Sequence, residues 1–115
     1  MANREGAKAD VLQGTLDLMV LQTLEGLGPS HGYAIAARLE QVSNGAIQLN
    51  MGTLYPALMR LEQRGLLKGA WSVTDNNRKA RLYALTAAGK RDLVKERQVW
   101  DRMAGIMQTL LRGEN

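Results

Sequence analysis

The pattern of apolar and polar positions along the chain predicts four helices. Apolar side chains recur every three or four residues, the repeat of an amphipathic helix, over residues 11–27, 31–42, 51–64 and 87–111. Residues 1–10 show no such periodicity, and we expect a mobile tail there. Ser30 precedes the second helix and Thr86 the last, and we expect the side chain of each to cap the helix that follows it.

The first of these helices carries apolar side chains on two faces. Its main stripe consists of Leu12, Leu16, Met19, Val20, Thr23 and Leu27. Leu18 and Leu21 lie on the other side. A small domain rarely covers both faces of a helix, so Leu18 and Leu21 are expected to contact a second subunit.

Residues 50–67, NMGTLYPALMRLEQRGLL, show the sharpest division between two helix faces. The apolar face consists of Leu54, Ala57, Leu58 and Leu61. The opposite face carries Gly52, Tyr55, Pro56, Met59, Arg60 and Gln63. That face has little bulk at its start and a cation and an amide further along, as a helix entering the DNA major groove requires. An ordinary amphipathic helix with a solvated polar face would show the same pattern.

The ends of this helix are marked by capping residues. Asn50 is a good N-cap, and Thr53 is a second candidate. Proline is well tolerated only in a first turn, so a start at Thr53 accommodates Pro56, whereas a start at Asn50 requires a small distortion. Gly65 ends the helix in either case.

Two short stretches of alternating residues predict strands instead of helices. A strand of a few residues is expected at 47–49, before the third helix. After Gly65 the period changes to two, over residues 67–73 and 81–86. The segment between them, 75–79, is rich in turn-forming residues and carries Arg78 and Lys79, which indicates a hairpin with a basic tip.

Three helices followed by a basic hairpin is the layout of a winged helix-turn-helix domain. The expected fold class is therefore mainly α with a small β wing. We expect residues 11–86 to form the winged domain and residues 87–115 a long C-terminal dimerisation helix. Leu93, Trp100 and Met107 recur at seven residues in that helix, with Met103, Leu110 and Leu111 close to them. A second copy of the chain is the simplest partner for this stripe.

Composition excludes several kinds of chemistry and favours an anionic partner. There is no cysteine, which rules out disulfides, thiolate zinc sites and a cysteine nucleophile. The single histidine, His31, cannot form a catalytic pair or a metal site alone, so we expect no enzyme activity, metal or cofactor. The formal net charge is +4, which is favourable for an anion such as DNA. The start of the chain has no apolar signal region, and a cytoplasmic location is expected.

Across residues 12–111 the sequence resembles the PadR family of bacterial transcriptional regulators, in its short branch with one C-terminal dimerising helix. The resemblance is carried by the run HGYAI, by NMGTLYPALMRLEQRGLL, by RKARLYALTAAGK and by Trp100. It implies a dimeric repressor that binds an inverted-repeat operator, in a family that often controls efflux, stress or detoxification genes. The wing departs from the family pattern, because Ala80 and Leu82 interrupt its arginine cluster.

Carried over residue by residue, the resemblance implies positions for the DNA contacts. Tyr33 would lie at the phosphate backbone. The reading helix would use Asn50, Thr53, Tyr55, Pro56 and Arg60. The wing would use Asn77, Arg78, Lys79 and Arg81. Each has a structural alternative: a solvated arginine at 60, a half-buried aromatic at 55 and a solvated charge run in the wing.

Two interpretations of Trp100 also remain open. At a heptad position it would pack the core of the dimer. In some relatives, however, the corresponding tryptophan lines a pore between subunits and stacks on flat aromatic drugs, so Trp100 and Met103 are candidate ligand contacts. For the whole chain, the alternative to a DNA-binding repressor is a protein-interaction or scaffold module that keeps the winged fold.

Overall fold

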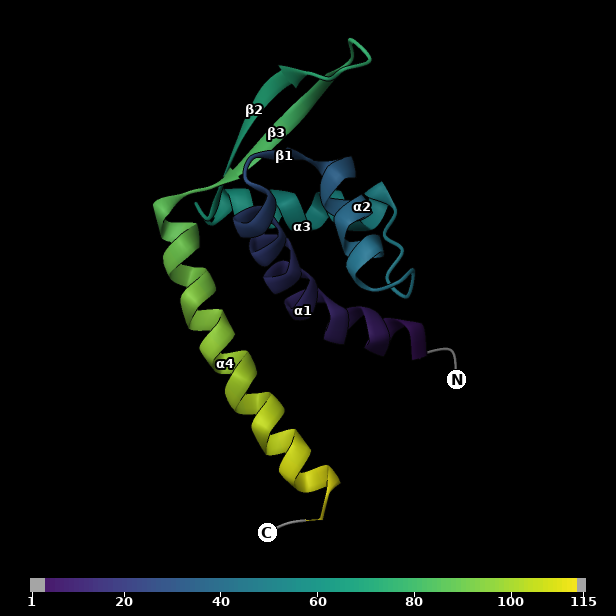
Figure 1. Ribbon diagram of the computed structural model, residues 1–115, viewed down its shortest axis with the longest axis vertical. Helices are drawn as coiled ribbons and strands as arrows, with labels where there is room; N and C mark the ends of the chain where they lie inside the picture. The colour runs from purple at the N-terminus through teal and green to yellow at the C-terminus, as the bar shows by residue number, and fades with distance from the viewer. Residues whose placement is uncertain (1–3, 114–115) are drawn as a thin grey trace.

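Four helices and a small antiparallel sheet form the part of the chain that the computed structural model describes, residues 4–113, with side chains from residue 14 onward. The fold is mainly helical with a β wing, as the sequence pattern predicts (Figure 1). The elements in chain order are α1 (Arg4–Leu27), β1 (Ser30–His31), α2 (Gly32–Val42), α3 (Met51–Gln63), β2 (Leu67–Val73), β3 (Lys79–Leu85) and α4 (Ala87–Leu111).

The core lies where α1, α2 and α3 meet the base of the sheet. Helix α3 contributes its whole apolar face, and Leu54, Leu58 and Leu61 are 0% exposed. Burying a side chain of this size stabilises the fold by about 1.5–3 kcal/mol. The other core side chains are Leu16, Val20, Leu21, Leu24, Ile35, Leu39, Ala57, Leu66, Leu67, Tyr83 and Leu93. This packing holds α3 rigidly and leaves its opposite face outward.

The sheet has the order β1-β3-β2, and β2 and β3 form the hairpin that projects from the domain (Figure 1). In this hairpin Leu67 pairs with Leu85 and Val73 with Lys79. The connection, residues 74–78, is called the wing loop below. It is closed by a hydrogen bond of 2.8 Å from the Thr74 amide to the Arg78 carbonyl oxygen. Asn77 adopts a φ of 59° there, a left-handed conformation that asparagine tolerates well.

The caps of α3 and α4 are those that the sequence indicates. The side chain of Asn50 accepts a hydrogen bond of 2.9 Å from the Thr53 amide, so α3 begins at Met51 and Pro56 lies inside the helix. The Thr86 hydroxyl accepts from the Gly89 amide at 2.9 Å and donates to the Gly65 carbonyl oxygen at 2.7 Å. Thr86 therefore joins the start of α4 to the turn that ends α3.

Three local predictions are wrong. Helix α1 begins at Arg4, not at residue 11, because helix-favouring residues extend it without apolar periodicity; residues 1–3 lie outside the described range. Residues 47–49 form no strand, and the third strand is instead Ser30–His31, which pairs with β3. Ser30 does not cap α2, since its hydroxyl donates to the Gly28 carbonyl oxygen at 2.8 Å and His31 occupies the N-cap position.

Helix α4 leaves the domain after its first turns (Figure 1). Leu93 is 3% exposed and belongs to the core, whereas the apolar side chains further along are about half exposed or more. Those on one face, called the α4 stripe below, are Trp100, Met103, Met107 and Leu110. Within residues 4–113 no helix combines the length and apolarity needed to cross a membrane, and no cluster of three acidic or histidine side chains is suited to a metal ion.

At Gly89, α4 lies close to the backbone of the turn that follows α3, and this contact predicts a strong effect of substitution. A Cβ at this buried position would lie far inside contact distance of the Leu66 carbonyl oxygen, which is backbone and cannot rotate away. Gly89→Ala should therefore lower the free energy of unfolding in urea by at least about 1–3 kcal/mol. The matched control is Gly105→Ala in the same helix, where a Cβ meets nothing within 4 Å. That change should stabilise the protein by about 0.5–1 kcal/mol; similar effects from both would contradict the close approach.

Candidate nucleic-acid interface

The outward face of α3 combines small, polar and apolar side chains and is open to solvent. Its exposed residues, called the reading face below, are Gly52, Thr53, Tyr55, Pro56, Met59 and Gln63. Tyr55 is 43% exposed and Met59 56%. Because the opposite face is fully buried, α3 cannot rotate to present other residues, and of the predicted groove-facing set Thr53, Tyr55 and Pro56 lie outward.

Arg60 does not belong to this face. Its guanidinium Nη2 donates to Asp17 Oδ1 of α1 at 2.9 Å, and the two side chains are 34% and 18% exposed. The prediction that Arg60 faces outward is therefore wrong. A helical projection of residues 51–64 places Arg60 at the border of the two faces, and only the position of α1 determines which way the side chain turns.

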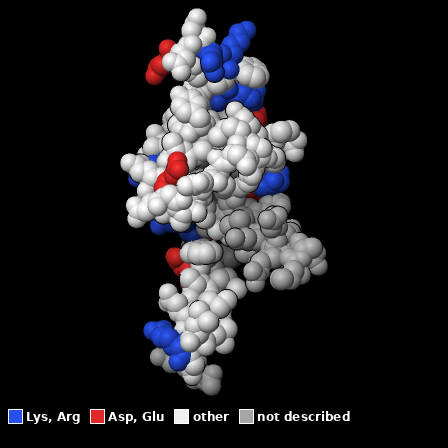
Figure 2. Space-filling view, turned by 90° about the vertical axis from the view of Figure 1, so that its right-hand side faces the viewer, with Lys and Arg blue, Asp and Glu red and all other residues white. Residues whose placement is uncertain are grey.

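The wing presents two cations beside an exposed aromatic ring. Arg78 and Lys79 are both exposed, and Lys and Arg side chains gather at the wing end of the molecule (Figure 2). Tyr33, at the start of α2, is 56% exposed and lines a hollow of about 420 Å³ together with Arg78, Lys79 and other residues at the wing tip. Tyr33 stacks on His31, with ring centroids 5.8 Å apart, and His31 Nδ1 lies 3.1 Å from the Arg81 carbonyl oxygen. The structure therefore places Tyr33 beside the wing tip. His31 and Arg81, which join this region to β3, are 50 residues apart in the sequence.

Arg81 lies on the same strand as Lys79 but turns inward, so its predicted position in an exposed wing cluster is also wrong. It pairs with Glu62 of α3 at 2.5 Å, and its guanidinium lies 5.5 Å from the Trp71 ring centroid and 5.9 Å from that of Tyr83. Gly69 leaves the room for it, because a Cβ there would collide with the guanidinium. Arg81 thus fastens the wing to α3.

Tyr83 is the one buried tyrosine of the described chain, at 2% exposure. Burial raises its pKa above the ordinary value of 10.0, and the neighbouring Arg81 offsets part of that rise. The phenol therefore stays protonated at neutral pH, and Tyr83 acts as core packing beneath the wing.

A groove of about 480 Å³ separates α3 from the wing. It is lined by Tyr55, Met59, Glu62, Trp71, Lys79, Ala80, Arg81 and Tyr83. Trp71 is 69% exposed and Met59 56%. Met59 lies on the predicted outward face of α3 but was not singled out as a DNA contact, and Trp71 was not predicted to lie at the DNA. Trp71 could have been identified from its position in the alternating pattern of β2. Met59 could have been identified from its position opposite the leucines of α3.

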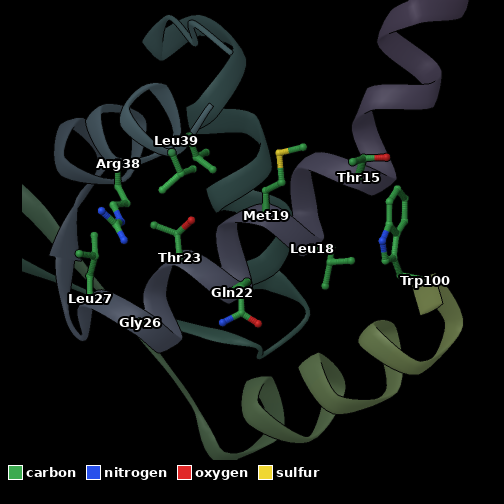
Figure 3. Close-up of a pocket in the computed structure, with 11 residues that line it drawn as sticks. Thr15, Leu18, Met19, Gln22, Thr23, Gly26, Leu27, Arg38, Leu39 and Trp100 are labelled. Atoms are coloured by element: carbon green, nitrogen blue, oxygen red, sulfur yellow. The ribbon is translucent and has the colours of Figure 1, made fainter. Parts of the chain in front are cut away.

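A second, apolar hollow lies on another side of the molecule, between α1, α2 and α4. This α1–α2 concavity has a volume of about 520 Å³ and includes Leu18, Met19, Leu27, Leu39 and Trp100 in its lining. In Figure 3 the Trp100 indole extends from α4 toward Thr15 of α1 at one end of the concavity.

The structure also places the predicted interface residues. Leu18 lines the concavity and is accessible to a partner, as are Trp100, Met103, Met107, Leu110 and Leu111. Leu21 and Leu93 are 1% and 3% exposed and pack in the core of their own chain, so neither is available to a partner. Their predicted place in the dimer interface is wrong, because both side chains belong to the hydrophobic core of their own chain.

Comparison with known proteins agrees with this geometry. The family model of the PadR-like transcriptional regulators matches residues 20–95. The chain is 40% identical over 78 residues to an uncharacterised 37.1 kDa protein in transposon TN4556 of Streptomyces fradiae, covering 68% of this chain and 21% of that one. It is 37% identical over 65 residues to the transcriptional regulator Rv3488 of Mycobacterium tuberculosis, covering 56% of this chain and 60% of that one. The chain thus spans about a fifth and three fifths of these two relatives.

Among solved structures, a PadR family transcriptional regulator from Eggerthella lenta is similar along almost the whole chain. The TM-score is 0.73, the identity is 31%, and the similarity covers 96% of both chains. The family model, which matches residues 20–95, covers α3, the wing and the start of α4. The chain belongs to the PadR-like family of transcriptional regulators.

Proposed function

We propose that this regulator is a homodimeric repressor that binds an inverted-repeat operator in double-stranded DNA. The observation that carries the proposal is the reading face of α3, held outward by a buried leucine face and flanked by the exposed cations of the wing. In this arrangement α3 enters the major groove and the wing contacts phosphates or the minor groove.

The residues divide by the kind of contact that each can make. Thr53 and Tyr55 offer hydroxyls near the start of α3, where the exposed Gly52 allows a close approach to DNA. Asn50 uses its side-chain oxygen to cap the helix, which leaves its amide NH₂ as a donor. The two wing cations, Arg78 and Lys79, contact the phosphate backbone, and Tyr33 and Asn77 lie beside them and contact it too. Pro56 contributes apolar contact, since it has no N–H to donate.

The first prediction of this proposal concerns the wing. Arg78→Ala and Lys79→Ala should each weaken binding to operator and to unrelated DNA alike, because phosphate contacts carry no sequence information. Each change should reduce the slope of log affinity against log salt by about one. The measurement is fluorescence anisotropy over a salt series, with an operator selected from random duplexes.

Arg97→Ala serves as the control for this experiment, since it removes the same charge from an exposed position on α4. It should leave the salt slope unchanged. If the wild type shows no salt-dependent binding to any duplex, the repressor proposal fails, and the winged fold would instead serve as a protein-interaction module.

Dimerisation through α4 is the second part of the proposal. The α4 stripe is about half exposed or more, over a 25-residue helix whose length is roughly 37 Å. Leaving so much apolar surface in water is unfavourable. In a two-fold dimer, the α4 stripe of one chain packs against the α4 stripe of the other. Two reading faces related by a two-fold axis should then lie about 34–36 Å apart, one turn of DNA.

The second prediction follows from this stripe. Met103→Glu combined with Leu110→Glu should convert the dimer to monomers, because an unpaired carboxylate in an apolar seam is costly. Sedimentation velocity at micromolar concentration measures the change. The control is Gln98→Glu with Arg102→Glu, which adds two carboxylates to exposed positions on the opposite face of α4 and should leave the dimer intact. A wild-type monomer under the same conditions would contradict the proposal.

The third part is release from DNA by a small planar aromatic molecule. Trp100 is 52% exposed at the end of the apolar α1–α2 concavity, with the neighbouring Met103 of the α4 stripe 53% exposed. Stacking on an indole is worth about 0.5–1.5 kcal/mol beyond area burial, and methionine adapts to varied shapes. Such an effector releases the operator only if it binds the DNA-free arrangement more tightly than the DNA-bound one.

The third prediction tests this effector site with flat cationic dyes. In a Trp71→Tyr background Trp100 is the only tryptophan, and its fluorescence should be quenched to saturation. The same titration should show no saturable binding in a Trp100→Ala variant that is still dimeric by sedimentation. If no dye quenches saturably and Trp100→Ala is monomeric, Trp100 is a packing residue only.

A further inference from the structure

Ion pairs to three different elements hold the last turns of α3. Three alternate residues, Arg60, Glu62 and Arg64, pair with Asp17 of α1, Arg81 of β3 and Asp92 of α4, respectively. The pairs differ greatly in geometry. The N–O distance is 2.9 Å for Arg60 and Asp17 but 3.9 Å for Arg64 and Asp92, and the Arg64 side chain is 53% exposed.

The pair between Asp17 and Arg60 is the tighter contact between α3 and another helix. Only 18% of the Asp17 side chain is exposed, and the Arg60 Nε is fully buried without a hydrogen-bond partner among the described residues. The Asp17 carboxylate is therefore mostly shielded from solvent, while about a third of the Arg60 side chain, 34%, remains exposed. Loss of one partner would leave the other charge partly buried and unpaired, which costs more than loss of a surface pair.

Both partners lie on rigid parts of the molecule. Asp17 follows Leu16 and precedes Val20, which are 7% and 0% exposed, so its backbone is fixed by the core. Arg60 lies one helical turn after Pro56 and directly after Met59, two residues of the reading face. The leucine face already fixes the rotation of α3, so a contact at Arg60 acts on the remaining freedom, the tilt of the helix on the side where it meets α1.

We propose that Asp17 and Arg60 form a positioning pair, which fixes the pose of α3 and so determines operator specificity without touching DNA. This inference rests on the proposed function, since it assumes that α3 reads base edges. Readout of bases depends on the pose of α3 to within a fraction of an ångström, whereas attraction to phosphates does not. Loss of the pair should consequently reduce specific binding and spare non-specific binding.

The sign of the effect distinguishes positioning from electrostatics. Asp17→Asn removes a negative charge from a protein that binds a polyanion, so electrostatics alone predicts equal or tighter binding to all DNA. Release of Arg60 from its partner would add to that attraction. If the pair positions α3, Asp17→Asn should instead weaken binding to the operator and to no other DNA.

The experiment measures the affinity of variants of the whole chain for a selected operator and for a scrambled duplex. All measurements use the same salt concentration and a temperature well below the melting temperature of the least stable variant. Asp17→Asn should weaken operator binding about five- to tenfold and leave scrambled DNA unchanged or slightly tighter. Asp17→Glu keeps the carboxylate and should restore most of the specificity. The matched control is Asp92→Asn, which makes the same charge change at the longer pair and should leave the ratio of the two affinities unchanged.

Arg60→Lys provides a second variant if Asp17→Asn does not fold. It keeps the charge but loses the guanidinium fork, and it should also lower the ratio of operator to scrambled affinity. An unchanged ratio in a folded Asp17→Asn or Arg60→Lys variant would overturn the inference. A wild type that shows no preference for any sequence would instead overturn the proposed function.

Discussion

The burial of one face of α3 is the constraint on which the rest of the structure depends. Leu54, Leu58 and Leu61 are completely withdrawn from water between α1, α2 and the base of the wing. Rotating the helix by one residue would expose leucine side chains, each worth about 1.5–3 kcal/mol of burial. The core therefore decides which side chains face outward, and the reading face is as well fixed as the core itself.

Charge in this domain has two separate roles that the net value of +4 does not reveal. Arg60 and Arg81 are held by carboxylates of the same chain, and they join α3 to α1 and to the wing. Arg78 and Lys79 remain exposed on the hairpin. Internal pairing orients α3 and the wing relative to each other, and the exposed cations are then available to an anionic partner.

Helix α4 is packed into the winged domain at its start and exposes apolar side chains along its later turns. Its start is closely packed, since Thr86 bonds to Gly65, Gly89 touches the Leu66 backbone and Leu93 enters the core. Its later turns carry the α4 stripe, and Trp100 lies at the end of the α1–α2 concavity. Helix α1 borders that concavity through Leu18 and holds Arg60 through the preceding residue, Asp17. The same helix thus contacts both the apolar hollow and the reading helix.

The sequence by itself determined the features that depend on local spacing. Leucines at helical intervals marked the buried face of α3, alternation marked the wing, and Asn50 and Thr86 cap their helices as expected. It did not determine the partners of Arg60 and Arg81, which lie 43 and 19 residues away along the chain. Nor could it show that Leu21 and Leu93 pack within their own chain. Helical and strand periodicity is a property of neighbouring residues, whereas an ion pair or a buried contact between distant residues exists only once the helices have packed. That packing decided which cations stay exposed.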